Sequence, residues 1–282
     1  MRKFRHILKV AALAAIAGYV AFCAAVYLRQ EWFFFRPSEQ AARLENAHAN
    51  GYPAERVDYK SADGTPLYAW YTKPRPGKKI VVFLHGNSYN IEKFYPKMLP
   101  LAEAGYGAFI PEYRGFGGVK GRITEAGLTA DAEAAVACLH GLGYQNRDIF
   151  IYGFSMGTHM ASYVASQNGE KAPFAGLILE APFNTLLEVA RAHVWIPLPL
   201  ELIVRDKYDN LALIQKIRTP LLIMAGTDDE TIPAGLAEDL FAAAPEPKQL
   251  VIYRGGGHSD LYNFRNYRDV LAWLKNCLLY TS

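Results

Sequence analysis

The chain has 282 residues, of which 51% are hydrophobic and 20% are charged, a balance typical of a globular protein with a sizeable core. Its formal net charge is +3, but four positive charges crowd into residues 1–9, so the remainder carries about −1. This small charge argues against a nucleic acid as the partner.

An uncharged apolar run follows these basic residues, and we expect residues 10–29 to form a transmembrane helix. Residues 1–9 are then a cytoplasmic flank, and the aromatic residues that follow the run form an interfacial belt. The positive-inside rule predicts a single-pass protein with its main domain on the non-cytoplasmic side of the membrane. The alternative is a cleaved secretory signal, although the run is long for one and lacks a clear small-x-small cleavage site.

Residues 30–50 are expected to be a juxtamembrane segment, with a helix over residues 38–50. A β-hairpin follows, with strands at residues 57–59 and 67–71 around a turn at residues 62–64. Residues 80–84 and 107–111 are continuous apolar runs, which are typical of strands covered on both faces in a parallel sheet. The glycine-rich residues 113–118 lack the Lys-Ser/Thr of a phosphate loop, so they predict a backbone turn.

Strands and helices alternate through the rest of the chain. Helices are predicted at residues 128–139, 160–165, 234–243 and 270–274, and strands at residues 149–154, 177–180, 221–225 and 249–253. This alternation predicts an α/β fold with a mostly parallel, doubly wound sheet over residues 51–276. Residues 182–218 interrupt the alternation and are interpreted as a cap insert over the carboxyl end of the sheet, and residues 277–282 are interpreted as a tail.

The sequence Gly153-Phe154-Ser155-Met156-Gly157 places a serine between a predicted strand and a predicted helix. In this G-x-S-x-G pattern, glycine is needed on either side because side chains there would collide with the backbone of a strained turn. The pattern therefore predicts a nucleophile elbow with Ser155 at its apex. Without a general base a serine hydroxyl is a weak nucleophile, so a histidine and an orienting acid are expected elsewhere.

Candidates for both partners follow later strands. Asp228 and Asp229 come after the strand at residues 221–225, and His258 lies in a glycine-rich loop after the last strand. The resulting order of serine, acid and histidine is the order found in α/β-hydrolases. His159 is interpreted as a structural histidine, and no group of histidines, cysteines and carboxylates has the spacing of metal ligands, so we expect no metal and no cofactor.

Residues 51–274 resemble the α/β-hydrolase superfamily, and within it the BEM46/ABHD12/13-like group of membrane-anchored serine hydrolases. The motifs that carry this resemblance are Leu84-His85-Gly86-Asn87, Tyr113-Arg114-Gly115-Phe116-Gly117, the elbow, the Asp-x-x-Ile-Pro run of residues 229–233, and Gly257-His258. One departure is Gly118-Val119, because the group commonly has a serine two residues after its Arg-Gly-aromatic-Gly turn.

The resemblance implies a role for each site residue. It selects Asp229 over Asp228 as the acid, with Glu180 as a remote third option, beside Ser155 and His258. It also implies that the backbone N–H groups of Asn87 and Met156 form an oxyanion hole. The alternative for Asn87 is that it is only a turn residue.

The function that this resemblance implies is a serine hydrolase that cleaves an ester, thioester or amide through an acyl-enzyme, as a carboxylesterase or lipase-like enzyme. The expected substrate is a small-molecule or lipid acyl compound, and Trp195 in the apolar cap is a candidate substrate-binding residue. Two alternatives remain open: a peptidase of the serine aminopeptidase type, and a binding protein that keeps the fold without turnover.

Overall fold

A computed structural model describes residues 2–167 and 173–280. Its main sheet consists of β2 (Glu55–Lys60), β3 (Pro66–Thr72), β4 (Ile80–Leu84), β6 (Gly107–Pro111), β7 (Ile149–Phe154), β8 (Gly176–Glu180), β9 (Leu221–Gly226) and β10 (Lys248–Tyr253). The eight strands lie in the order β10-β9-β8-β7-β4-β6-β3-β2. All neighbours from β10 to β6 are parallel, whereas β3 and β2 are antiparallel at one edge. The predicted α/β architecture, with its hairpin, is confirmed.

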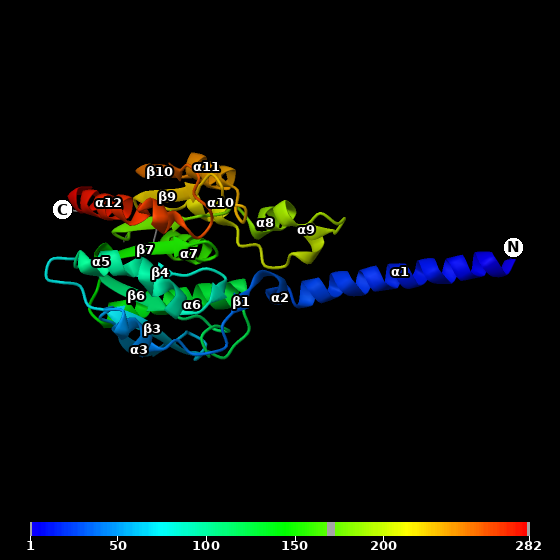
Figure 1. The fold of residues 1–282 in the computed structure, drawn as a ribbon, viewed down its shortest axis with the longest axis horizontal. Helices are drawn as coiled ribbons and strands as arrows, with labels where there is room; N and C mark the ends of the chain where they lie inside the picture. Colours follow the sequence, from blue (N-terminus) through cyan, green and yellow to red (C-terminus); the bar gives the residue numbers. More distant parts are fainter. Residues whose placement is uncertain (1, 168–172, 281–282) are drawn as a thin grey trace.

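Helices lie on both sides of this sheet (Figure 1). They are α3 (Leu44–Ala49), α4 (Ile91–Phe94), α5 (Leu99–Glu103), α6 (Glu125–Gly141), α7 (Gly157–Gln167), α10 (Asn210–Ile214), α11 (Ala234–Ala243) and α12 (Asn266–Tyr280). Alternate residues of β4 pack on opposite sides of the sheet, because successive side chains of a strand point in opposite directions. Ile80 and Val82 belong to the core under α6 and α7, and Val81 and Phe83 belong to the core under α5 and α12. Both cores are apolar, which explains why the central strands are continuous apolar runs.

The N-terminal helix α1 (Arg2–Leu28) projects away from the domain as one long rod (Figure 1). It is long and apolar enough to cross a membrane, a criterion that a signal sequence also meets. Two short elements connect it to the domain, namely α2 (Glu31–Phe34) and β1 (Arg36–Pro37). Strand β1 pairs in parallel with β5 (Ser88–Tyr89) in a second, two-stranded sheet.

The prediction of a helix over residues 38–50 is wrong for the first half of that range. Only α3, at Leu44–Ala49, is helical in this segment. The backbone of the preceding residues bonds to the domain instead of to itself. The N–H of Ala42 donates to the Tyr68 hydroxyl, and the N–H of Arg43 donates to Glu92. These tertiary hydrogen bonds satisfy the backbone, so local helix propensity does not decide the structure of this segment.

The predicted turn after β6 is present, and a buried cation fixes it. Arg114 donates through its guanidinium to Asp131 of α6 and to Asp63 of the hairpin turn, at 2.7 Å each. The backbone N–H of Arg114 also donates to Asp131, whose side chain is 1% exposed. Removal of one partner from such a buried pair typically destabilises a protein by about 3–5 kcal/mol. This cluster therefore joins α6, the hairpin and the loop that follows β6.

Residues 182–218 contain α8 (Leu186–His193), α9 (Leu200–Ile203) and α10. Helix α10 packs into the body of the domain, where Asn210 Oδ1 lies 3.2 Å from Nδ1 of the buried His159. Helices α8 and α9 stand away from the body beside the C-terminal part of α1 (Figure 1). We call residues 186–204 the cap. The hydroxyl of Tyr19 in α1 donates to the carbonyl of Pro197 in the cap at 2.8 Å.

Helix α12 continues past residue 276, where the tail was expected to begin, and Cys277 is buried. The sequence alone left open a disulfide between Cys138 and Cys277. In the described residues, no disulfide joins them. Burial raises the pKa of the Cys277 thiol to about 12. The thiol is therefore protonated at neutral pH and packs as a small apolar side chain.

Candidate active site

Ser155 lies at the carboxyl end of the central strand β7, immediately before α7. Its φ is 53°, in the left-handed region that strains a residue with a side chain. Close packing of this turn against β4 explains the glycine that follows: a Cβ on Gly157 would lie 1.9 Å from the carbonyl oxygen of Leu84. The turn thus presents the serine hydroxyl above the carboxyl edge of the sheet, where ligands of open α/β sheets bind.

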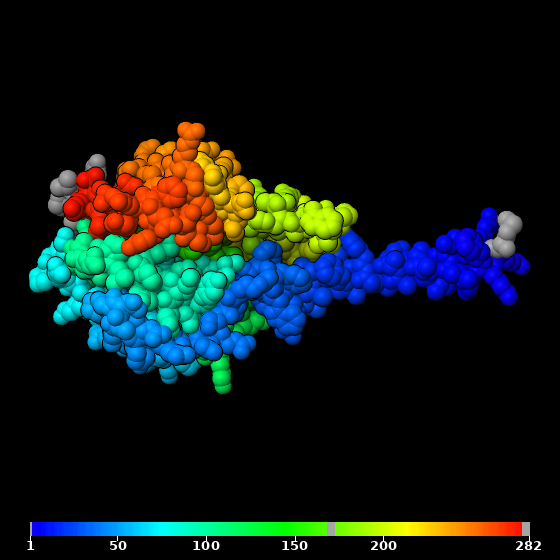
Figure 2. Space-filling model, in the orientation of Figure 1, coloured from blue at the N-terminus to red at the C-terminus, as the bar shows by residue number. Residues whose placement is uncertain are grey.

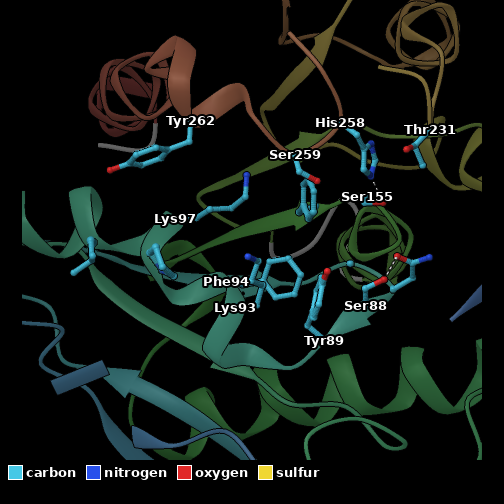
Figure 3. Close-up of a pocket in the computed structure, with 15 residues that line it drawn as sticks. Ser88, Tyr89, Lys93, Phe94, Lys97, Ser155, Thr231, His258, Ser259 and Tyr262 are labelled. Atoms are coloured by element: carbon cyan, nitrogen blue, oxygen red, sulfur yellow. Dashed lines mark hydrogen bonds between the residues drawn. The ribbon is translucent and has the colours of Figure 1, made fainter. Parts of the chain in front are cut away.

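His258 lies between Ser155 and Asp229. Its Nε2 is 2.9 Å from Ser155 Oγ (Figure 3). Its Nδ1 is 2.8 Å from Asp229 Oδ2. A carboxylate only accepts hydrogen bonds, so Nδ1–H donates to Asp229, and Nε2 is left to accept the serine proton. This is the arrangement that a serine nucleophile requires.

Asp229 is held in place from the other side. Its Oδ1 accepts the backbone N–H groups of Thr231 and Ile232, at 2.8 and 2.7 Å, and its side chain is 1% exposed. The other two candidate acids lie elsewhere. Asp228 accepts a bond from the Thr227 hydroxyl at the surface, and Glu180 binds Lys97 at 2.6 Å and the Tyr152 hydroxyl. Asp229 alone of the three contacts His258 among the described residues.

The loops that carry Asp229 and His258 meet because β9 and β10 are parallel neighbours. The N–H of Asp228 donates to the carbonyl of Gly256 at 2.8 Å. A Cβ on Gly226 would lie 2.1 Å from the carbonyl oxygen of Gly256, so the contact requires glycine. The absence of a side chain at Gly226, the last residue of β9, therefore permits this close approach of backbones.

Asn87 and Met156 lie beside Ser155 on the wall of a small cavity of about 50 Å³, which we call the waist. Their backbone N–H groups donate no hydrogen bond to any of the described residues. Two unused donors next to a nucleophile can bind an oxygen that gains negative charge. The structure thus brings together Ser155, His258, Asp229 and the two residues named for the oxyanion hole.

The Asn87 side chain is bound to the segment that follows α1. Its Nδ2 donates to the carbonyl of Phe34 at 2.6 Å, and the backbone carbonyl of Asn87 accepts the N–H of Arg36 at 2.8 Å. Neither contact has a signal in the sequence, where the aromatic residues around Phe34 were interpreted only as a membrane-interface belt. The position of Asn87 therefore depends on residues 34–36.

A larger cavity of about 520 Å³, the serine cavity, opens in front of Ser155 and His258 (Figure 3). Its opposite walls include Phe94, Lys97 and Tyr262. The Lys97 ammonium pairs with the buried Glu180 at 2.6 Å. No motif marks Lys97 or Tyr262 as site residues, because they line the cavity from two short 3-10 helices, Tyr95–Met98 and Leu261–Phe264, that are distant from Ser155 in the sequence.

Comparisons with known proteins identify related sequences and similar folds. Residues 75–205 match a family described as serine aminopeptidase, S33. An uncharacterized protein of Mycobacterium tuberculosis is 34% identical over 92% of this chain and 90% of its own. The chain belongs to the α/β-hydrolase superfamily. Its fold also resembles solved members: a Pyrococcus furiosus esterase has a TM-score of 0.72 at 18% identity, with 87% of this chain and 98% of that chain covered.

An acylaminoacyl peptidase of Pyrococcus horikoshii gives a TM-score of 0.63 at 19% identity over 79% of this chain. The chain spans 41% of that peptidase's length. Esterases and peptidases thus share this α/β-hydrolase fold, and the fold alone does not distinguish them.

Within residues 2–167 and 173–280, no cluster of three or more histidine, cysteine or acidic side chains could hold a metal ion.

A third cavity, of about 460 Å³, lies between the cap and the N-terminal helices of this α/β-hydrolase. We call it the α1 cavity. Phe22 and Val26 of α1, Phe34 of α2, and Val194 of the cap are among its wall residues. Trp195 borders this cavity rather than the serine cavity, and its side chain is 92% exposed.

Proposed function

We propose that this protein is a serine hydrolase that cleaves acyl esters, as a carboxylesterase or lipase-like enzyme, through a covalent acyl-enzyme. The observation that carries the proposal is the hydrogen-bonded series from Asp229 through His258 to Ser155, beside two unused backbone donors. A binding protein would have no need for a strained serine that is already aligned with a base.

In the first half of the reaction, Ser155 Oγ attacks the carbonyl carbon of the ester, and His258 Nε2 takes the hydroxyl proton. The carbonyl oxygen becomes an oxyanion, which the N–H groups of Asn87 and Met156 stabilise. The bond to the alcohol oxygen then breaks, and the proton on Nε2 passes to that oxygen. The alcohol leaves, and the acyl group stays on Ser155.

In the second half, water takes the place of the alcohol. His258 Nε2 removes a proton from the water as its oxygen attacks the acyl carbon, and the same two N–H groups bind the oxyanion. The bond to Ser155 Oγ breaks, and the proton returns to Oγ. The products are a carboxylic acid and the free enzyme. Asp229 stabilises the imidazolium in both halves and keeps its ionised form.

The serine cavity favours an ester over a peptide with a free amino terminus. Its lining includes Lys93 and Lys97, and none of its described lining residues is Asp or Glu. An aminopeptidase needs an anionic group to bind the substrate's ammonium. Glu180 balances the charge of Lys97, and none of the described lining residues of the serine cavity, the waist or the α1 cavity is Asp or Glu. The family description and the peptidase likeness keep a serine aminopeptidase-type activity as the second candidate.

We expect kcat/KM for p-nitrophenyl esters to rise from acetate to octanoate and to exceed that for aminoacyl p-nitroanilides. Each methylene that enters an apolar site contributes up to about 0.8 kcal/mol. We would measure this series by steady-state kinetics on the full chain in detergent. Fluorophosphonate labelling of Ser155 would give the concentration of active sites. The ester proposal is contradicted if an aminoacyl anilide is the best substrate. Absence of labelling would support the binding-protein alternative.

We further propose that residues 10–29 remain as a membrane anchor, with residues 1–9 in the cytoplasm and the domain on the other side. The contact of Tyr19 with Pro197 supports retention of the helix, since a cleaved segment would leave the cap without this partner. Gln30, 1% exposed, accepts the backbone N–H of Arg205 through Oε1 at 2.8 Å, which fixes the end of α1 to the domain. The BEM46/ABHD12/13-like group that the sequence resembles is also membrane-anchored.

A reporter fused to the C-terminus is expected to be active only when it folds outside the cytoplasm, because basic residues flank the N-terminal end of the helix. Fractionation should leave the protein in the membrane after a carbonate wash, and N-terminal sequencing should show that residues 1–29 are still attached. A fusion to a reporter that is active only in the cytoplasm is the control. Activity of that control reporter would reverse the proposed orientation.

A further inference from the structure

We propose that the acyl chain of a membrane lipid ester occupies the α1 cavity, and that it enters from the bilayer between α1 and the cap and reaches Ser155 through the waist. This inference rests on the proposed hydrolase function. It adds the binding site of the chain, its route, and the phase from which the substrate comes.

The three cavities share wall residues and so lie next to one another. Phe34, Val189 and Thr231 line both the α1 cavity and the waist. Ser155 and Thr231 line both the waist and the serine cavity. Asn87 lines all three. A chain in the α1 cavity is therefore directed at the serine from the side of the two unused N–H donors.

The wall of the α1 cavity suits a hydrocarbon chain. The helices before the domain provide Phe22, Val26, Phe33 and Phe34, and the cap provides Val189, Ala190, Val194, Ile196, Leu198, Leu200, Ile203 and Val204. The polar members of the described wall are Asn87, His193, Thr231 and the indole of Trp195, and His193 is already bonded to the carbonyl of Thr231. None of the described residues that line the α1 cavity is Asp, Glu, Lys or Arg. A volume of about 460 Å³ is in the range of small-molecule sites.

The depth of the cap relative to α1 identifies the phase that this cavity faces. Tyr19, which bonds to Pro197, stands nine residues before the end of α1, or about 13 Å along the helix. Half of a hydrocarbon layer is about 15 Å thick. The cap lies beside the part of α1 that is nearest the domain (Figure 2). If α1 spans the bilayer, the tip of the cap therefore lies within one leaflet rather than above it.

The surface of the cap agrees with this depth. Trp195 is 92% exposed and Leu202 is 75% exposed, as expected for side chains that contact lipid. The charges of Arg191 and Glu201 neutralise each other in an ion pair between α8 and α9. Trp195 and Ile196 stand at the rim of the α1 cavity, so the rim opens at the level of the acyl chains. The serine cavity is left for the alcohol that departs.

A photoreactive inhibitor tests the route in the unmodified chain. The probe is an alkylphosphonofluoridate with a dodecyl tail that ends in a diazirine; its phosphorus reacts with Ser155, and its tail takes the place of the acyl chain. With the full chain in phosphatidylcholine vesicles, irradiation should attach the tail to peptides from residues 20–34 or 186–204. Attachment near Tyr89, Lys93 or Tyr262 would overturn the proposal. If Ser155 does not react, the hydrolase function itself fails, which is a separate result.

A matched pair of substitutions in α1 gives a second test. Val26→Trp places an indole in the α1 cavity, whereas Val20→Trp places one on the same helix at a site that is 59% exposed and does not line the cavity. The ratio of kcat/KM for octanoate to that for acetate should fall at least tenfold in Val26→Trp and stay within twofold of wild type in Val20→Trp. Because the ratio cancels any loss of folded enzyme, an unchanged ratio in Val26→Trp would contradict the proposed site.

Discussion

Ser155→Ala is expected to lower kcat for p-nitrophenyl esters by about a millionfold, and His258→Ala by a similar factor. The two side chains act as one unit: Nε2 of His258 lies 2.9 Å from Ser155 Oγ, so neither the attack nor the proton transfer proceeds without the other partner. The Ser155→Ala,His258→Ala double variant should therefore lose no more activity than either single variant.

To measure this loss, each variant is expressed and purified separately from the wild-type enzyme. A trace of wild-type enzyme in the preparation would mask so large a loss. Thermal unfolding serves as the control for folding, since an alanine keeps a Cβ at the strained φ of 53° and should leave Tm nearly unchanged. Turnover within tenfold of wild type in either single variant would show that Ser155 and His258 are not the catalytic pair.

Asp229→Asn is expected to lower kcat by about ten-thousandfold because it places the histidine in the wrong tautomer. The structure shows how. The backbone N–H groups of Thr231 and Ile232 both point at Oδ1, so an asparagine should turn its carbonyl oxygen toward them and its NH₂ toward His258. Nδ1 must then accept, Nε2 carries the proton, and Ser155 loses its base.

Asp228→Asn is the matched control, because it makes the same chemical change one residue away. Asp228 is bonded to the Thr227 hydroxyl at the surface and makes no contact with His258. We expect its kcat to stay within a few fold of wild type. A larger loss for Asp228→Asn than for Asp229→Asn would reverse the assignment of the acid.

The parts of this protein that the sequence predicts are those governed by local periodicity and by strict steric rules. Strand β4 is apolar at every position because both of its faces are covered, and its bounds were predicted without error. The elbow was predicted because Gly157 has no room for a side chain. The choice of Asp229 over Asp228 came from a family pattern. The two residues are of the same type, and the sequence does not show which side chain points toward His258.

Contacts between distant segments could not be predicted. Residues 38–43 have helix-forming composition, yet hydrogen bonds to Tyr68 and Glu92 give them another structure. The waist has walls from α2, the loop before β5, the elbow, the segment from Phe183 into the cap, and the loop that carries Asp229, and no short pattern in the sequence relates these five segments. Trp195 was selected for its apolar surroundings, but whether it faces a cavity or lipid depends on where α1 stands beside the cap.

The attachment of Asn87 to Phe34 and Arg36 determines how much of the chain a soluble form must retain. A protease that cuts before Gln30 would release a domain whose Asn87 loop is still pinned, although one wall of the α1 cavity would be lost with the helix. A cut after Pro37 would free the same loop from both of its hydrogen bonds. Cleavage at these two places, eight residues apart, would thus yield two different soluble proteins: one in which Asn87 keeps its hydrogen bonds to residues 34–36, and one in which Asn87 has lost them.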